Sequence, residues 1–122
     1  MMGGVGHAEI RKFYSQYFIP QLPPDTQTDL ISRTIGTDQI VDELIFKFTH
    51  TRQMDWMLPG IKPTEKYVEV GLVVIIKFKE NKVVHEHIYW DQASVLLQIG
   101  LLEKKDLPIV GIESALKLKN LK

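Results

Sequence analysis

The chain has 122 residues, the size of one ordinary domain, and a domain of this length buries about 65% of the surface that its unfolded chain exposes. Its 15 basic and 15 acidic residues give a formal net charge of zero, which argues against nucleic acid or an anionic membrane as a partner. The absence of cysteine excludes disulfides, thiolate metal sites and thiol nucleophiles. No apolar stretch is long enough to span a membrane, so we predict a single soluble, cytoplasmic domain over residues 1–122.

The chain opens with a glycine-rich segment that is followed by a helix. Gly3, Gly4 and Gly6 predict an unstructured lead-in. Residues 8–19 then place apolar and aromatic side chains at helical spacing, which predicts an amphipathic helix with an unusually aromatic buried stripe. Pro20 is expected to end this helix.

Two strands are predicted next, after a proline-containing connector at 21–27. Residues 28–36 and 39–52 both alternate with the period of two that is typical of strands, and a short turn separates them. In the second strand the alternation places Asp42 and His50 on the same face as two phenylalanines, so we expect both polar side chains to point toward the core.

The second half predicts a hydrophobic loop and a hairpin. Residues 53–65 are too apolar for a simple spacer, and we expect this loop to fold back over a hydrophobic opening. Strands are predicted at 67–79 and 82–91, and residues 80–81 form a two-residue hairpin turn between them. The four predicted strands can pair as an antiparallel meander, which makes the fold α+β with helices on one face of a curved sheet.

Two helices are predicted to close the chain. Asp91 is positioned to cap the N-terminus of the first, and Gly100 is the expected stop signal. A short helix near residues 112–118 follows a turn, and it could equally fray.

The second half of the chain contains a set of spaced motifs: Lys82 after the turn, Glu86 beside His87, Asp91, and the Leu-rich helix ending at residues 96–100. These motifs, together with the order of the elements, resemble the SnoaL-like family of the nuclear transport factor 2-like superfamily. The similarity extends over about residues 4–102. A narrower resemblance, to proteins described as carboxymethylenebutenolidase-like, involves the loop at 55–60 and the run at 85–92.

The resemblance implies a cone-shaped, cystatin-like fold around a hydrophobic cavity, built on a curved sheet of about four strands. Members of the family open with a further helix and strand, so it also implies that the N-terminal part of the family fold is missing here. Polyketide cyclases of the family have an inward carboxylate on the last strand, at a place where this chain has Ile88. The nearest inward acid is Glu86, one pleat earlier, so the cyclase base does not transfer directly.

The candidate catalytic residues are Glu86, Asp42 and His50, because each interrupts an otherwise apolar inner face. If the two carboxylates approach each other across a cavity, their pKa values should separate, and the pair could supply a general base and a general acid. The alternative is structural pairing of each carboxylate, for example with Arg33 or Arg52. His50 is either a neutral base near Asp42 or a hydrogen-bonded core histidine.

Aromatic and apolar side chains on the same faces are candidate ligand contacts, able to stack against a planar molecule, or else plain core. They are Tyr14, Trp56, Phe46, Phe48, Ile88 and Trp90. His85 and His87 project from one side of a strand, but no third ligand is fixed by sequence, so we predict neither a metal site nor a cofactor.

Two functional hypotheses follow. In the first, the cavity binds a small hydrophobic or cyclic molecule and, if the protein is an enzyme, its carboxylates transfer a proton next to a carbonyl. In the second, the protein is a non-catalytic ligand-binding or dimerisation module that forms a homodimer through the outer face of the sheet. The outer-face residues are Val41, Ile45, Val73, Ile75 and Tyr89.

Overall fold

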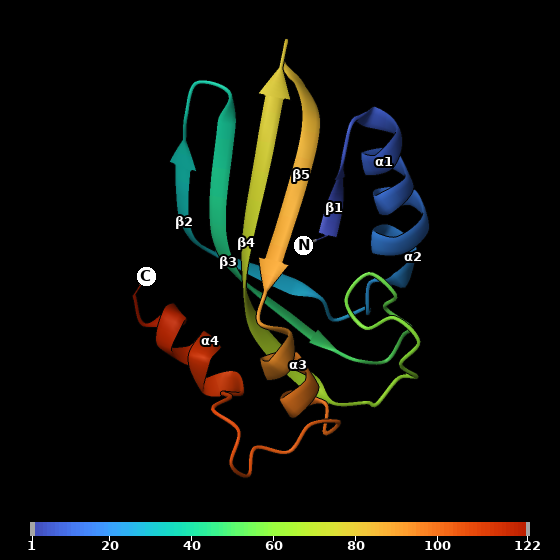
Figure 1. Ribbon diagram of the computed structural model, residues 1–122, viewed down its shortest axis with the longest axis vertical. Helices are drawn as coiled ribbons and strands as arrows, with labels where there is room; N and C mark the ends of the chain where they lie inside the picture. Colours follow the sequence, from blue (N-terminus) through green and yellow to red (C-terminus); the bar gives the residue numbers. More distant parts are fainter. Residues whose placement is uncertain (1, 122) are drawn as a thin grey trace.

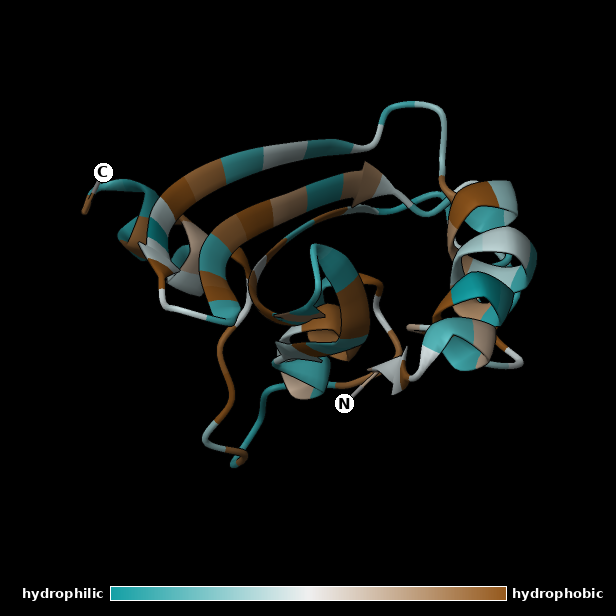
Figure 2. Ribbon diagram, turned by 90° about the horizontal axis from the view of Figure 1, so that it is seen from above, coloured by the Kyte–Doolittle hydropathy of each residue, from teal (hydrophilic) through white to brown (hydrophobic). Residues whose placement is uncertain are grey.

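The structure, a computed structural model, describes residues 2–121 and is built on one antiparallel sheet of five strands in the order β1-β5-β4-β3-β2 (Figure 1). The strands are β1 (Met2–Val5), β2 (Gln27–Ile35), β3 (Gln39–Thr49), β4 (Tyr67–Lys79) and β5 (Lys82–Trp90). Hydrophilic and hydrophobic residues alternate along the curved strands, as expected for a sheet with two different faces (Figure 2). The α+β class is therefore confirmed, with one strand more than the four predicted.

The helices form two groups, one beside β1 and β5 and the other after β5 in the chain. One continuous helical run consists of α1 (His7–Lys12), the π-helical segment η1 (Phe13–Phe18) and α2 (Ile19–Gln21), and it lies beside β1 and β5 (Figure 1). The C-terminal helices are α3 (Gln92–Gln98) and α4 (Ile112–Lys119), and α4 packs on the opposite face of β4 and β3. Among the described residues, no helix is long and apolar enough to cross a membrane.

The additional strand is β1, in the segment that was expected to be unstructured. Gly3 pairs with His87 and Gly4 pairs with Glu86 in an antiparallel ladder. Gly3 has a φ of +110°, and a Cβ at this position would collide with the backbone oxygen of Glu86. Glycine is usually a poor strand former, but here only glycine allows β1 to approach β5 this closely.

The first helical run also differs from the prediction, because it is partly a π-helix and continues past Pro20 to Gln21. The N–H of Ile19 donates to the carbonyl of Tyr14, five residues earlier, which is the hydrogen bond of a π-helix. Pro20 lies in the first turn of α2, where its missing N–H and fixed φ are tolerated. The wider turn places Phe13 and Phe18, also five residues apart, with their ring centroids 5.6 Å from each other.

The hairpin between β4 and β5 has the predicted two-residue turn. Glu80 and Asn81 both have positive φ angles, 53° and 64°, as the central residues of a type I′ turn require. Next to the turn the register shifts, since Lys77 pairs with His85 whereas Phe78 pairs with Val83. This irregularity interrupts strict alternation in β5, so face assignments from periodicity fail at Val83.

The hydrophobic core lies between the inner face of the sheet, the first helical run and the loop after β3. That loop folds back as expected, and Met54, Trp56 and Leu58 are each at most 2% exposed. Trp56 contacts Phe13, Phe18 and Phe46 through its ring. The space that the family resemblance implies to be a hollow chamber is thus occupied by Trp56.

The C-terminal helices agree with their sequence signals. The Asp91 side chain accepts a hydrogen bond from the backbone N–H of Ser94 at 3.1 Å, so it is the predicted N-cap of α3. Helix α4 is formed over Ile112–Lys119, and its Ala115 is 1% exposed against the sheet.

Candidate functional site

The Glu86 carboxylate is held by the hydroxyl of Tyr14. Glu86 lies on the inner face of β5 and is 6% exposed. The Tyr14 hydroxyl, from η1, is 2.6 Å from one carboxylate oxygen and 2.8 Å from the other. A phenol has one proton to donate, so both carboxylate oxygens share a single donor.

This pair contains a buried acid that has no cationic partner among residues 2–121. Burial raises the pKa of Tyr14, and the hydrogen bond to Glu86 and its negative charge raise it further. The phenol therefore stays protonated and available as a hydrogen-bond donor. A buried carboxylate with one neutral donor is costly to maintain, and such groups are candidates for proton transfer.

Asp42 is in a different situation, because it forms a bidentate pair with Arg33. The guanidinium Nε and one terminal nitrogen donate to its two oxygens at 2.7 and 2.9 Å. Asp42 on β3 pairs with Val74 of β4, and Glu86 on β5 pairs with Ile76 of β4, so the central strand β4 separates the two acids. With two strand spacings between them, about 10 Å, the two carboxylates do not meet as a pair.

His50 is also placed apart from Glu86, at the end of β3, and it is completely buried. Its Nδ1 accepts a hydrogen bond from the backbone N–H of Thr64 at 3.2 Å and lies 3.0 Å from the Thr64 hydroxyl oxygen. Nδ1 is thus an acceptor, and the ring proton of the neutral form resides on Nε2, which has no partner among the described residues. Desolvation lowers the pKa of His50.

This environment predicts a pH dependence of folding stability. His50 is neutral in the folded state, whereas in the unfolded chain it binds a proton below about pH 6.5. The free energy of unfolding should therefore fall as the pH drops below 6.5, by at most about 1.4 kcal/mol per pH unit from this residue, until the lowered folded-state pKa is reached. The free energy of unfolding can be measured by urea denaturation at several pH values between 7.5 and 5. Plotted against pH, it should have a shallower slope for His50→Gln than for the wild type. The exposed control His7→Gln should keep the wild-type slope, and an unchanged slope in His50→Gln would contradict the assignment.

The candidate ligand contacts divide into two groups. Phe46, Phe48 and Ile88 are at most 3% exposed and belong to the hydrophobic core. Tyr14 lines a pocket beside α1, and Trp56 and Trp90 line a pocket at the rim of the sheet.

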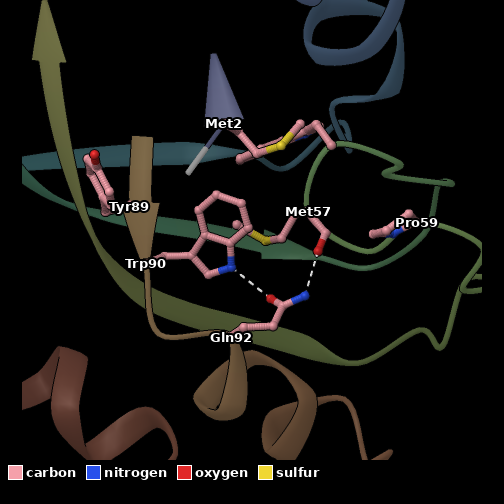
Figure 3. Close-up of a pocket in the computed structure, with 7 residues that line it drawn as sticks. Met2, Met57, Pro59, Tyr89, Trp90 and Gln92 are labelled. Carbon is pink, nitrogen blue, oxygen red and sulfur yellow. Dashed lines mark hydrogen bonds between the residues drawn. The ribbon is translucent and has the colours of Figure 1, made fainter. Parts of the chain in front are cut away.

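The rim pocket has a volume of about 310 Å³ and is formed by residues from β1, the loop after β3, β5 and the start of α3 (Figure 3). Its lining consists of Met2, Trp56, Met57, Pro59, Tyr89, Trp90 and Gln92. The Trp56 and Trp90 rings meet edge to face with centroids 5.4 Å apart.

Some polar groups of the residues that line the rim pocket have hydrogen-bond partners, and one has none. Trp90 Nε1 donates to the Gln92 side-chain oxygen at 2.7 Å, and the Gln92 amide nitrogen donates to the Met57 carbonyl at 2.7 Å (Figure 3). Trp56 is 2% exposed, and its Nε1 has no acceptor among residues 2–121. One buried indole N–H of a residue that lines the pocket therefore remains without a hydrogen-bond partner.

Four residues that line the rim pocket were not among the candidates from the sequence: Met2, Met57, Pro59 and Gln92. Gln92 directly follows the helix cap Asp91, and a polar side chain at that first helical position could have pointed to it. Met2 could not be found, because its place depends on the unpredicted strand β1.

The two histidines on β5, His85 and His87, lie on its outer face with their rings stacked 4.6 Å apart. Within the described residues, no group of three or more His, Cys, Asp or Glu side chains is arranged to hold a metal ion.

No family model matches this sequence, and no curated protein sequence matches it. Among solved structures, it is similar to AclR, a candidate hydroxylase from Streptomyces galilaeus, with a TM-score of 0.60 and 23% identity over 81% of this chain and 70% of AclR. It is also similar to TsrD from Streptomyces laurentii, with a TM-score of 0.55 and 20% identity over 78% of this chain. The chain therefore shares its fold with AclR and TsrD over about four fifths of its length.

At these identities the comparison shows a shared fold and leaves the activity to be argued from this chain. The matched region covers 63% of TsrD, less than two thirds of that protein. The comparisons thus support the expected type of fold, whereas the narrower resemblance to carboxymethylenebutenolidase-like proteins has no counterpart in them.

Proposed function

We propose that this protein binds a small cyclic or aromatic molecule in the rim pocket. The observation that supports this most directly is that Trp56, which lines the pocket beside Trp90, has a buried Nε1–H without an acceptor among the described residues. A volume of about 310 Å³ lies at the lower end of the range for small-molecule sites, which suits a ligand of one or two rings.

Such a ligand would use both properties of the pocket. Its ring would pack against Trp90 and the Met57 side chain, and a carbonyl or ether oxygen would accept the hydrogen bond from Trp56 Nε1. Making that bond would satisfy a donor that is otherwise buried without a partner, and a neutral bond of this kind contributes about 0.5–1.5 kcal/mol. A ligand with an oxygen should thus be preferred over a hydrocarbon of the same shape.

A separate catalytic hypothesis assigns proton transfer next to a carbonyl to Glu86, a residue that does not line the rim pocket. Arg33 compensates the charge of Asp42, whereas the Glu86 carboxylate has only the Tyr14 hydroxyl. The Tyr14 hydroxyl would then shift its hydrogen bond from Glu86 to a substrate oxygen and polarise it, whereas His50 lies too far from Glu86 for this role. With any substrate that is turned over, Glu86→Gln should abolish turnover, and unchanged turnover would end this role.

Ligand binding can be measured without a label, because both tryptophans of the chain line the rim pocket. Titration with cyclohexanone should change the intrinsic fluorescence in a saturable manner. Trp56→Phe keeps a ring but removes the N–H, so it should weaken cyclohexanone binding about threefold to tenfold and leave methylcyclohexane binding nearly unchanged.

The matched control is Tyr67→Phe, which removes a hydroxyl from an exposed side chain that does not line this pocket. A linear, non-saturating response to cyclohexanone in the wild type would contradict the proposal. Equal weakening of ketone and hydrocarbon by Trp56→Phe would contradict the assigned hydrogen bond.

The second candidate function is homodimerisation through the outer face of the sheet. Tyr89 is 45% exposed there, and Val41, Val73 and Ile75 are partly exposed. Ile45 is fully buried, in a part of the sheet that α4 packs against, so it does not contribute to such an interface. A melting temperature that rises with protein concentration in the absence of ligand would favour this function, and a constant one would argue against it.

A further inference from the structure

A second hollow lies between α1 and the turn of the β4–β5 hairpin, away from the rim pocket. It consists of two adjoining pockets of about 380 and 530 Å³ that share His7, Lys82 and Val83 in their walls. Helix α1 lies beside β5, and this packing forms the two sides of what we call the hairpin hollow (Figure 1).

The hairpin hollow is basic although the chain as a whole carries no net charge. Arg11, Lys79 and Lys82 line it, and none of them forms an ion pair with another residue in the described part of the chain. Among the residues that line its two pockets, Glu80 is the one carboxylate. Three permanent cations against one anion give a local positive potential that favours an anionic ligand.

Two of these cations are held directly opposite each other. Lys79 and Lys82 are cross-strand partners next to the type I′ turn, whose geometry fixes their register. Like charges directly opposite each other destabilise a sheet. An anion that binds between the two ammonium groups would remove this repulsion.

Another part of the wall of the hairpin hollow, beside His7, is apolar. Ile10 and Val83 line it, and Val83 is 38% exposed. The Tyr14 hydroxyl is already engaged with Glu86, so it separates that buried carboxylate from the hollow. The anionic group of a ligand would consequently lie at the hairpin end, near the lysines, and its apolar part against α1.

We propose that the hairpin hollow binds a small organic anion that carries one carboxylate on an apolar ring. The opposed Lys79 and Lys82 would hold the carboxylate, with Arg11 across the hollow, and the ring would pack on Ile10 and Val83. This site is separate from the rim pocket, so it does not depend on the function proposed above.

The probes are sodium benzoate and its neutral isostere benzamide, added to the ¹⁵N-labelled full chain at constant ionic strength. Benzoate should produce saturable amide shifts in residues 6–14 and 78–84, and benzamide should bind at least fivefold more weakly. Lys79→Gln with Lys82→Gln should weaken benzoate binding at least fivefold and raise the melting temperature of the ligand-free protein. If Lys79 and Lys82 served only to keep the protein soluble, replacing them would not both weaken benzoate binding and raise the melting temperature.

Two matched variants complete the test. Lys62→Gln with Lys66→Gln removes two exposed charges from the loop after β3 and should leave benzoate binding unchanged. Glu80→Gln removes the one acidic side chain of the hollow and should tighten binding about twofold. Equal shifts with benzamide, or equal weakening by the Lys62 and Lys66 control, would overturn the proposal. Shifts confined to the surroundings of Trp56 and Trp90 would place the ring in the rim pocket and overturn it as well.

Discussion

Replacing Trp56 with alanine is expected to lower the free energy of unfolding by about 3–5 kcal/mol, the range for removal of a large aromatic side chain from a packed core. Trp56 is 2% exposed, and its ring contacts those of Phe13, Phe18, Phe46 and Trp90. It therefore joins the first helical run to the sheet, and its loss leaves a cavity that rigid neighbours on both sides cannot fill. Urea denaturation followed by circular dichroism measures the change.

Tyr89→Ala serves as the control, because Tyr89 is 45% exposed and belongs to the same pocket lining. It should cost less than about 1 kcal/mol, as exposed substitutions usually do. A loss below 1 kcal/mol for Trp56→Ala would mean that Trp56 does not fill the space between helix and sheet.

The second large effect is expected at the buried acid. Tyr14→Phe removes the hydroxyl that donates to Glu86 and leaves a carboxylate that is 6% exposed without a donor. Leaving a buried polar group unsatisfied costs about 1–3 kcal/mol, and more when the group is charged. The free energy of unfolding at pH 7 should fall by at least this amount.

A double-mutant cycle separates the lost hydrogen bond from lost packing. Tyr14→Phe combined with Glu86→Leu replaces both partners by apolar groups, so it should recover at least about 1 kcal/mol relative to Tyr14→Phe alone. Additive losses would contradict direct coupling between the hydroxyl and the carboxylate.

The sequence predicted the elements whose signals are local. The helical spacing before Pro20, the Asp91 cap and the Glu80–Asn81 turn each depend on a few neighbouring residues, and each predicted element is present. Strand β1 could not be predicted, because its glycines favour a strand only where the backbone of Glu86 lies close by.

The candidate site was predictable only in part, for the same reason. Alternation placed Glu86 on the inner face, but its partner Tyr14 is 72 residues away and lies in a π-helical turn that no periodicity argument anticipates. The Arg33–Asp42 pair depends on the register between β2 and β3, which an irregularity between Leu30 and Ser32 shifts. Such registers are set by the assembled sheet and are not encoded in either strand alone.

The most direct measurement of the proposed function is ¹⁹F NMR of the protein labelled with 5-fluorotryptophan, which gives one resonance for each of its two tryptophans. Because Trp56 and Trp90 line the same pocket, titration with cyclohexanone should shift both resonances along saturation curves that share one dissociation constant. Two resonances that stay in place throughout the titration, or that move with different dissociation constants, would contradict the binding of a small cyclic molecule in the rim pocket.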